Sequence, residues 1–169
     1  MDITTYIQQQ LAGARRQVDV VMQDLTDEQF NWLPPGTLSP ISATFIHIVA
    51  GEDYQIQVVA QGRPRLWEAQ AWGEKVGVPN PPNPNGGWDV YKTVQLAVAP
   101  VLAYQQAVRA ATDAYLAGLT MEELGREVNY ARRAMPVANL LMMLVVHSAS
   151  HAGEIAAIKG MQGVKGLPF

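Results

Sequence analysis

The sequence contains no cysteine and little charge. None of its 169 residues is cysteine, and charged residues make up only 16% of the chain. The absence of cysteine excludes disulfides, thiolate metal sites, iron–sulfur clusters and a cysteine nucleophile. Apart from methionine, the soft ligands available for a transition metal are three histidines.

Neither a basic charge excess nor a long hydrophobic run is present. The formal net charge of −3 gives no electrostatic reason to expect a nucleic-acid partner. The N-terminus has neither the basic region nor the apolar stretch of a signal peptide. The most apolar run, Val137 to Val146, contains Asn139 and is too short to cross a bilayer. We therefore expect a cytoplasmic protein with no nucleic-acid and no membrane partner.

Apolar residues recur at steps of three and four along four segments, which predicts four long helices. With 49% hydrophobic residues, a chain of this length can bury one core, so residues 1–169 are expected to form a single domain. Asp2, Ser39 and the threonines of two capping-box patterns, Thr26 and Thr120, are predicted N-caps. Pro100 is expected to kink or split the third helix. The predicted helices cover residues 3–25, 40–60, 89–117 and 136–159.

A proline- and asparagine-rich connection separates the second and third predicted helices. Residues 79–87 contain four prolines and three asparagines, which excludes a helix there. Connections as long as residues 61–87 are uncommon in compact domains and are usually functional or disordered. Trp67, Trp72 and Trp88 flank the segment and favour packing on the body. The expected architecture is all-α, a four-helix bundle with one long connection.

The run from Val137 to Val146 is apolar on every side of its predicted helix. This pattern has two interpretations. The last helix is either the most buried member of the bundle, or it also faces another subunit.

The three histidines have a spacing that suits a metal ion. His147 and His151 are four residues apart and lie about 40° apart on one helix face. If the second and fourth helices are neighbours at similar depth, His47 completes a three-histidine set. Three protein nitrogens with open positions are typical of catalytic metal sites. The alternative is a cluster of core histidines in a metal-free bundle. Ser148 replaces the glutamate of H-E-x-x-H, which excludes a zincin.

Several segments resemble the DinB-like (YfiT-like) metalloproteins. Ser39-Pro40 followed by His47-Ile48-Val49-Ala50-Gly51-Glu52 is similar to the opening of the family's second helix. The segment His147-Ser148-Ala149-Ser150-His151-Ala152-Gly153-Glu154-Ile155 is similar to its last helix. The stretches 25–32 and 162–169 also look like the family's first connection and its C-terminal end. The resemblance covers most of the chain but not the Pro/Asn-rich connection.

The resemblance implies a single DinB-like domain over residues 1–169. In such domains the bundle has an up-down-down-up topology and is often a homodimer. A divalent metal would be held by His47, His147 and His151. Relatives include thiol S-transferases that use low-molecular-weight thiols, a thiol-dependent isomerase and metal-dependent hydrolases. Many family members carry Gln where this chain has Glu154.

Three residues near the histidines are candidate site residues. Glu154 shares the face of His151 and could orient its ring or act as a general base, and the alternative is a solvated carboxylate. Tyr54 lies about 20° from His47 on a helical projection and is a candidate for the substrate pocket, or a core residue. Met143 is one turn before His147 and would line the same pocket, or serves in helix packing.

The remaining charged residues are interpreted as structural or solvated. Glu52 points about 140° away from His47, so we expect it to hydrogen-bond to another helix. Arg63 and Arg65, and the pair Arg132 and Arg133, could receive the carboxylates of an anionic ligand. Solvated surface charge is the other interpretation.

The sequence thus predicts a metal-dependent enzyme that acts on a small molecule by thiol S-transfer or hydrolysis. The ion would be Zn²⁺, Ni²⁺ or another first-row divalent metal, since imidazole suits several of them. A nucleophilic sulfur would have to come from a low-molecular-weight thiol. The alternative is a helical bundle that binds a metal or a ligand without catalysis.

Overall fold

The computed structural model describes residues 2–78, 80 and 91–168. These residues are mostly helical, with one small antiparallel sheet of two strands. The elements are α1 (Ile3–Met22), α2 (Asp27–Asn31), α3 (Ile41–Asp53), the π-helix η1 (Tyr54–Ala60), α4 (Leu66–Ala69), α5 (Trp72–Val76), α6 (Val98–Ala117), α7 (Met121–Gly125), β1 (Glu127–Tyr130), β2 (Arg133–Pro136) and α8 (Val137–Met161).

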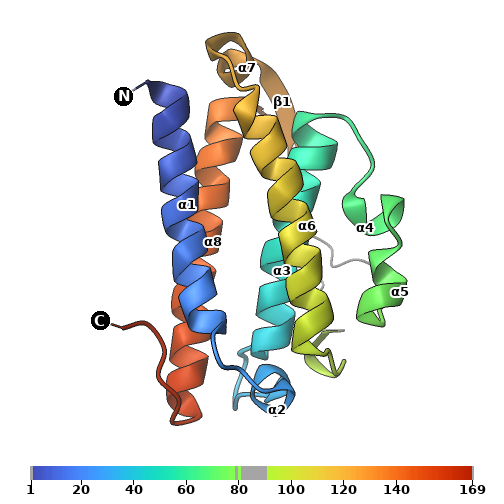
Figure 1. Ribbon diagram of the computed structural model, residues 1–169, viewed down its shortest axis with the longest axis vertical. Helices are drawn as coiled ribbons and strands as arrows, with labels where there is room; N and C mark the ends of the chain where they lie inside the picture. The colour runs from blue at the N-terminus through green and yellow to red at the C-terminus, as the bar shows by residue number, and fades with distance from the viewer. Residues whose placement is uncertain (1, 79, 81–90, 169) are drawn as a thin grey trace.

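The long helices α1, α3, α6 and α8 lie side by side (Figure 1). Helices α1 and α8 run in one direction, and α3 with its continuation η1 runs in the opposite direction, as does α6. Helix α1 packs along α8, and α3 contacts both α6 and α8. The predicted helices at 3–25, 40–60 and 136–159 are therefore confirmed, with ends shifted by a few residues.

Side-chain caps begin three of the helices. Asp2 accepts a hydrogen bond from the Thr5 backbone N–H at 2.8 Å, and Thr26 forms the complete predicted capping box. Thr120 accepts from the Glu123 backbone N–H at 3.1 Å. The predicted Ser39 cap is wrong. Helix α3 begins at Ile41 with Pro40 as its N-cap residue and no side-chain cap, so the helix starts one residue later than expected.

The third long helix begins later than the periodicity predicted. Residues 93–97 are not helical and α6 starts at Val98, while residues 89 and 90 lie outside the described part of the chain. The predicted kink at Pro100 is wrong. Pro100 is the third residue of α6, where a backbone N–H has no acceptor within the helix. Pro100 therefore lies in the first turn of α6, where it breaks no hydrogen bond of the helix and causes no kink.

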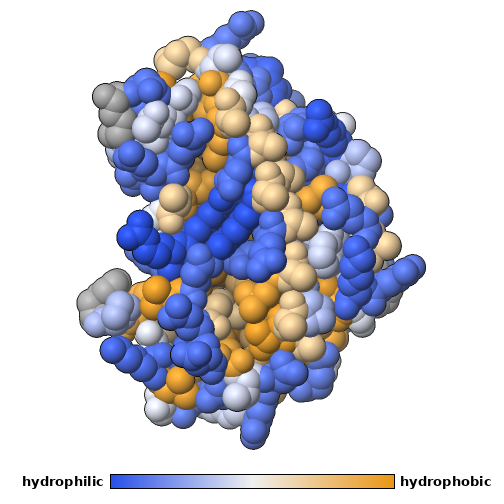
Figure 2. All heavy atoms as spheres, in the orientation of Figure 1, coloured by the Kyte–Doolittle hydropathy of each residue, from blue (hydrophilic) through white to orange (hydrophobic). Residues whose placement is uncertain are grey.

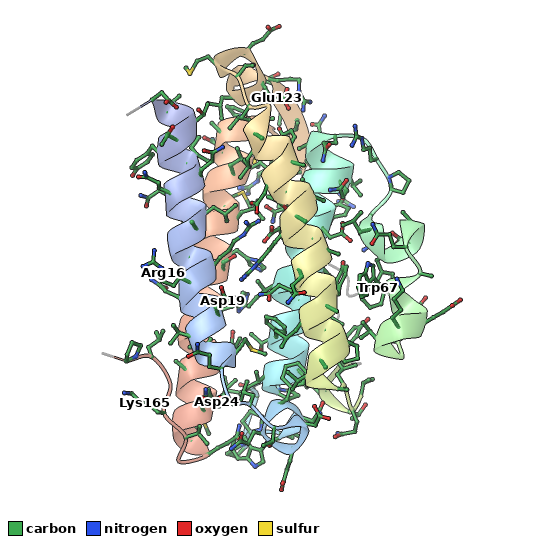
Figure 3. All side chains as sticks on the ribbon, in the orientation of Figure 1. Arg16, Asp19, Asp24, Trp67, Glu123 and Lys165 are labelled. Carbon is green, nitrogen blue, oxygen red and sulfur yellow. The ribbon has the colours of Figure 1, made fainter. Side chains whose placement is uncertain are left out.

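The first part of the long connection packs on the body, as predicted. The ring of Trp67 lies 5.2 Å from that of Tyr104 of α6, and the Trp72 ring lies 5.5 Å from it. Figure 3 shows Trp67 between α4 and α6. Trp88 and the Pro/Asn-rich residues 79 and 81–87 lie outside the described residues.

Helix α3, and not α8, is the most buried of the long helices. All thirteen residues of α3 are buried, because α2, α4, α6 and α8 all contact it. Helix α8 leaves Met142 and Val146 more than half exposed, at 55% and 54%. The interpretation of α8 as the most buried helix is wrong, and its contact with another subunit stays a prediction.

By length and composition, α8 is the one helix in the described part of the chain that could cross a membrane. Core helices of other proteins meet the same criterion, and α8 packs along α1 with Leu140, Leu144 and Ile155 fully buried. This feature is therefore weak support for a membrane span.

A polar layer separates two apolar clusters within the helices. One cluster gathers around Phe45 and Ile155, and the other around Ile56 and Leu140. Between them, Arg15 of α1 forms ion pairs with buried Glu52 of α3 and with Asp113 of α6. A hydrophilic band crosses the corresponding face between α1 and α6 (Figure 2). Arg15 and Asp113, together with Arg109 and Asp19, line a groove of about 470 Å³.

The segment before α8 is a β-hairpin formed by β1 and β2. Tyr130 pairs with Arg133, so Ala131 and Arg132 form a two-residue turn. Both turn residues have positive φ, 50° and 66°, as a type I′ turn requires. The usual Asn-Gly signal of that turn is absent, which is why the hairpin could not be predicted.

Asp53, the last residue of α3, joins α4 to the long helices. Its carboxylate accepts hydrogen bonds from the backbone N–H groups of Leu66 at 2.9 Å and Trp67 at 3.1 Å. It also accepts one from the Tyr104 hydroxyl at 2.7 Å. Asp53 is fully buried. If its carboxylate were removed, water could not readily replace it as the acceptor for these donors.

We predict that Asp53→Ala lowers the free energy of unfolding by about 2–4 kcal/mol, because three buried donors lose their acceptor. Urea denaturation followed by circular dichroism measures the change. The control is Glu68→Ala, which removes the ion pair of a half-exposed carboxylate with Arg65 and should cost about 0.5 kcal/mol or less. Equal effects of the two variants would contradict the role given to Asp53.

Candidate metal centre

The three histidines of the chain converge between α3 and α8. His47 extends from α3, and His147 and His151 extend from successive turns of α8. One ring nitrogen from each residue lies within 4.8 Å of the others. The Nε2 atoms of His47 and His147 are 2.8 Å apart. The helical spacing of His147 and His151 and the neighbourhood of the second and fourth long helices are thus confirmed.

Gly51 makes the close approach of the two helices possible. It lies one turn after His47 on α3, opposite the ring of His147. A Cβ atom at this position would lie 3.2 Å from Cε1 and 3.7 Å from Nδ1 of His147. A Cβ at 3.2 Å is closer than ordinary van der Waals contact, so a larger residue here would require the His147 ring to shift by a few tenths of an ångström.

Burial keeps the rings of His47 and His147 neutral. It lowers the pKa of His47 to about 3, with a smaller contribution from the neighbouring histidines. It lowers the pKa of His147 to about 4, and His151 again contributes. Metal ligation requires neutral imidazole, so both rings are in the ligating form at neutral pH without the loss of a proton.

Glu154 contacts His151 directly. Its Oε2 atom lies 2.7 Å from Nδ1 of His151, and the two side chains are 29% and 18% exposed. A carboxylate in this position fixes the ring orientation and leaves Nε2 directed elsewhere, as in carboxylate–histidine–metal arrangements. The geometry favours orientation of His151 over a purely solvated carboxylate. The predicted role of Glu154 as a general base stays a prediction.

The two candidate pocket residues, Tyr54 and Met143, lie on η1 and on α8. Tyr54 is the first residue of η1, and its ring lies 6.3 Å from that of Tyr130 on β1. Met143 is partly buried on α8, one turn before His147. Their assignment to a substrate pocket stays a prediction.

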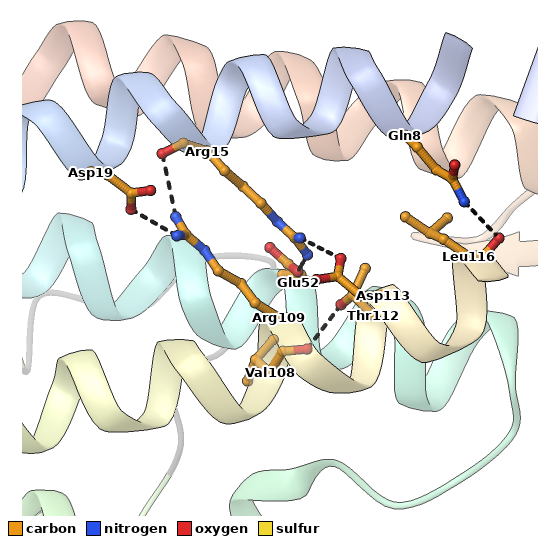
Figure 4. Close-up of polar contacts among 9 residues, drawn as sticks. All are labelled: Gln8, Arg15, Asp19, Glu52, Val108, Arg109, Thr112, Asp113 and Leu116. Atoms are coloured by element: carbon orange, nitrogen blue, oxygen red, sulfur yellow. Dashed lines mark hydrogen bonds and ion pairs between the residues drawn. The ribbon is translucent and has the colours of Figure 1, made fainter. Parts of the chain in front are cut away.

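Glu52 has the structural partner that was predicted. Its carboxylate pairs with Arg15 at 2.5 Å, and Arg15 also pairs with Asp113 at 2.6 Å (Figure 4). Arg109 pairs with Asp19 at 2.7 Å in the same network. Glu52 therefore joins α3 to α1 and does not extend toward the histidines.

The arginines considered as ligand-binding candidates are on the surface. Arg63, Arg132 and Arg133 are exposed. Arg65 pairs with Glu68 of the next turn. These positions fit solvated surface charge better than a binding role.

Two residues beside the cluster were not selected from the sequence. Gly51 is important only through its contact across the helix interface, which the sequence does not encode locally. Gln55, on η1, is 3% exposed. One sequence signal could have indicated Gln55: it and Gln57 are polar residues within a largely apolar predicted helix.

A comparison with models of protein families identifies the family of this chain. A model of the DinB superfamily matches residues 10–155. The chain belongs to the DinB superfamily. A search of curated proteins found no match.

Two solved structures share the fold. A conserved protein from Enterococcus faecalis superposes with a TM-score of 0.77 at 19% identity, covering 94% of this chain and 96% of the other. A DinB-like protein from Bacillus cereus gives 0.56 at 18% identity, covering 95% and 90%. Identities this low establish the similarity of fold alone.

We predict that the metal-free protein loses stability on acidification below pH 6.5. The pKa of His47 is about 3 in the folded protein and about 6.5 in the unfolded chain, so the unfolded state binds the proton first. The stabilising difference is complete above pH 6.5 and decreases as the pH falls toward 3. By pH 5 this single ring should cost about 1–2 kcal/mol.

Urea denaturation with a chelator present, at pH 7.5 and pH 5, measures this loss. Other groups also titrate in this range, and His47→Gln isolates the contribution of the ring. The variant should show a smaller drop between the two pH values. An identical drop in both proteins would show that His47 is not kept neutral by burial.

Proposed function

We propose that this chain is a metal-dependent enzyme that holds one divalent ion on His47, His147 and His151. The observation that carries the proposal is the convergence of three ring nitrogens within 4.8 Å. The proposed reaction is thiol S-transfer to, or hydrolysis of, a small-molecule substrate. It rests on membership of the DinB superfamily and on the donor set.

The donor set fits a first-row divalent ion. Three imidazoles suit Zn²⁺, Ni²⁺ and related ions, and three protein ligands leave positions for substrate. Nδ1 of His147 is buried beside Gly51 with no partner among the described residues, which leaves Nε2 as its ligating atom. Nδ1 of His151 faces Glu154, so Nε2 is again the atom available for the ion.

In the proposed site, each nearby residue has a distinct task. When bound, a divalent ion supplies Lewis acidity, which favours the deprotonated form of a water or a thiol. Glu154 holds the His151 ring in one orientation through Nδ1 and is the proposed acceptor of a substrate proton. Buried His47 and His147 remain neutral, so acidification alone does not readily protonate them.

The absence of cysteine determines the source of sulfur in the S-transfer reaction. With no thiol of its own, the chain requires a low-molecular-weight thiol as co-substrate. Tyr54 and Met143 are the proposed pocket residues for that thiol or for the substrate. Hydrolysis needs no such co-substrate, so a requirement for added thiol distinguishes the two reactions.

We further propose the assembly in which this site operates. The directions of α1, α3, α6 and α8 in Figure 1 support a four-helix bundle of up-down-down-up order. The exposed Met142 and Val146 on α8 support a homodimer. A cytoplasmic location remains our expectation from the sequence.

We predict about one divalent ion per chain in dialysed, untagged protein, measured by elemental analysis. Each of His47→Ala, His147→Ala and His151→Ala should lower the metal content at least tenfold, since two remaining imidazoles form an incomplete site. Glu154→Gln keeps all three ligands and should retain metal with an affinity reduced about 10–100-fold, as expected of a residue that orients a ligand.

Wild-type protein that lacks metal and does not rebind it on addition would contradict the proposal and favour a metal-free cluster. Metal that stays bound but does not exchange with added thiols or small anions would favour the non-catalytic alternative. In that case the ion would only stabilise the fold.

We predict that Gly51→Ala weakens metal binding at least tenfold while the protein remains folded. The added methyl group would contact the His147 ring at 3.2 Å and displace it, although alanine is the better helix former. Competition with a chromophoric chelator measures the affinity. The matched control is Gly153→Ala on α8, where a Cβ meets nothing within 4 Å. Equal affinities in both variants would contradict the role given to Gly51.

A further inference from the structure

A second polar feature lies one turn beyond the contact between Gly51 and His147. The side chain of Gln55 is buried, at 3% exposure, and its Oε1 atom has no hydrogen-bond partner among the residues that the structure describes. A buried amide oxygen without a donor loses its hydrogen bonds to water without replacement, so such a group calls for a specific explanation.

The position of Gln55 relates it to the histidine cluster. Gln55 follows Gly51 by four residues, so both lie on the side of the helix that faces α8. Gly51 faces the ring of His147 on α8. The rise along the helix between the two positions is about 6 Å. Gln55 thus lies one turn beyond Gly51, the residue of α3 that faces the His147 ring.

The amide nitrogen of Gln55 already has a hydrogen-bond partner. Its side chain hydrogen-bonds with Tyr130 of β1, and because Oε1 has no partner, the donor is the amide N–H group. Tyr130 in turn contacts Tyr54, the first residue of η1. These contacts fix the amide so that its oxygen is the atom left for a further partner, and that partner must be a hydrogen-bond donor.

The local backbone is also unusual. Gln55 lies in η1, a seven-residue π-helix that continues α3 directly. π-Helical segments are rare and occur frequently at functional sites. Two independent features, an unpartnered acceptor and a π-helix, therefore coincide one turn beyond Gly51.

We propose that Gln55 is a specificity-determining residue that accepts a hydrogen bond from a ligand of the histidine cluster. The ligand class is a small thiol that carries an N–H donor, with its sulfur at the metal and its N–H group at Oε1 of Gln55. The inference rests on the proposed function, because the thiol is placed by the metal.

The test compares two probe thiols that differ in one donor. N-Methyl-3-mercaptopropanamide has an amide N–H, and N,N-dimethyl-3-mercaptopropanamide has none. Titration of the cobalt(II)-loaded protein with each probe is followed by the thiolate-to-cobalt absorption band. Wild-type protein should bind the N–H probe about five- to tenfold more tightly, the effect of one hydrogen bond.

The variant Gln55→Leu should bind both probes with equal affinity and keep its cobalt content. Gln57→Leu is the matched control, since Gln57 is also buried on η1 and neither of its side-chain polar atoms is among the fully buried, unpartnered atoms of the described residues. It should keep the preference for the N–H probe.

The outcomes separate this inference from the proposed function. Bound cobalt with no preference in the wild type, or with a preference that persists in Gln55→Leu, would overturn the role of Gln55 alone. Protein that binds no cobalt would overturn the proposed function and this inference with it. If Gln55→Leu does not fold, the comparison of the two probes in the wild type still decides, since equal affinities overturn the inference.

Discussion

The contact between α3 and α8 at Gly51 is the constraint on which the candidate site depends. A glycine at this position lets the His147 ring occupy the space that a side chain would fill. The rings of His47, His147 and His151 then pack edge to face, with centroids 4.6–5.2 Å apart. Two helices, and not loops, supply all three rings, which holds their nitrogens on rigid elements.

Contacts of Glu52 and Asp53, near the end of α3, hold this helix against its neighbours. Apolar clusters lie on either side of the polar layer that contains Arg15 and Glu52. A buried ion pair recovers little net stability, because both groups lose water. Its clearer effect is positional, since it links α1 to α3 at the level of the cluster. Asp53 acts similarly at the end of α3, where it holds α4 against α6.

Much of the fold could be predicted because helical periodicity is a local signal. The stripes of apolar residues located α1, α3 with η1, and α8, and short polar motifs located the caps at Asp2 and Thr26. The start of α6 was missed because Val90 and Val94 continue the apolar spacing beyond the helix. The hairpin turn at Ala131 and Arg132 was missed because its residues lack the usual turn chemistry.

The site was predictable only in part, because its geometry arises between segments distant in sequence. The spacing of His147 and His151 is local, whereas the place of His47 required the assumption that two helices are neighbours. The pairing of Glu52 with Arg15, 37 residues away, was expected only as a contact with some helix. The role of Gly51 and the unpartnered oxygen of Gln55 depend on how the helices pack. The periodicity of apolar residues does not predict such contacts.

The most direct test of the central claim is a crystal structure of metal-loaded protein with anomalous diffraction measured at the absorption edge of the bound metal. We predict one anomalous peak between α3 and α8, about 2.0–2.1 Å from a ring nitrogen of His47, His147 and His151. A peak at another location, or none while the Nε2 atoms of His47 and His147 remain 2.8 Å apart, would contradict the account.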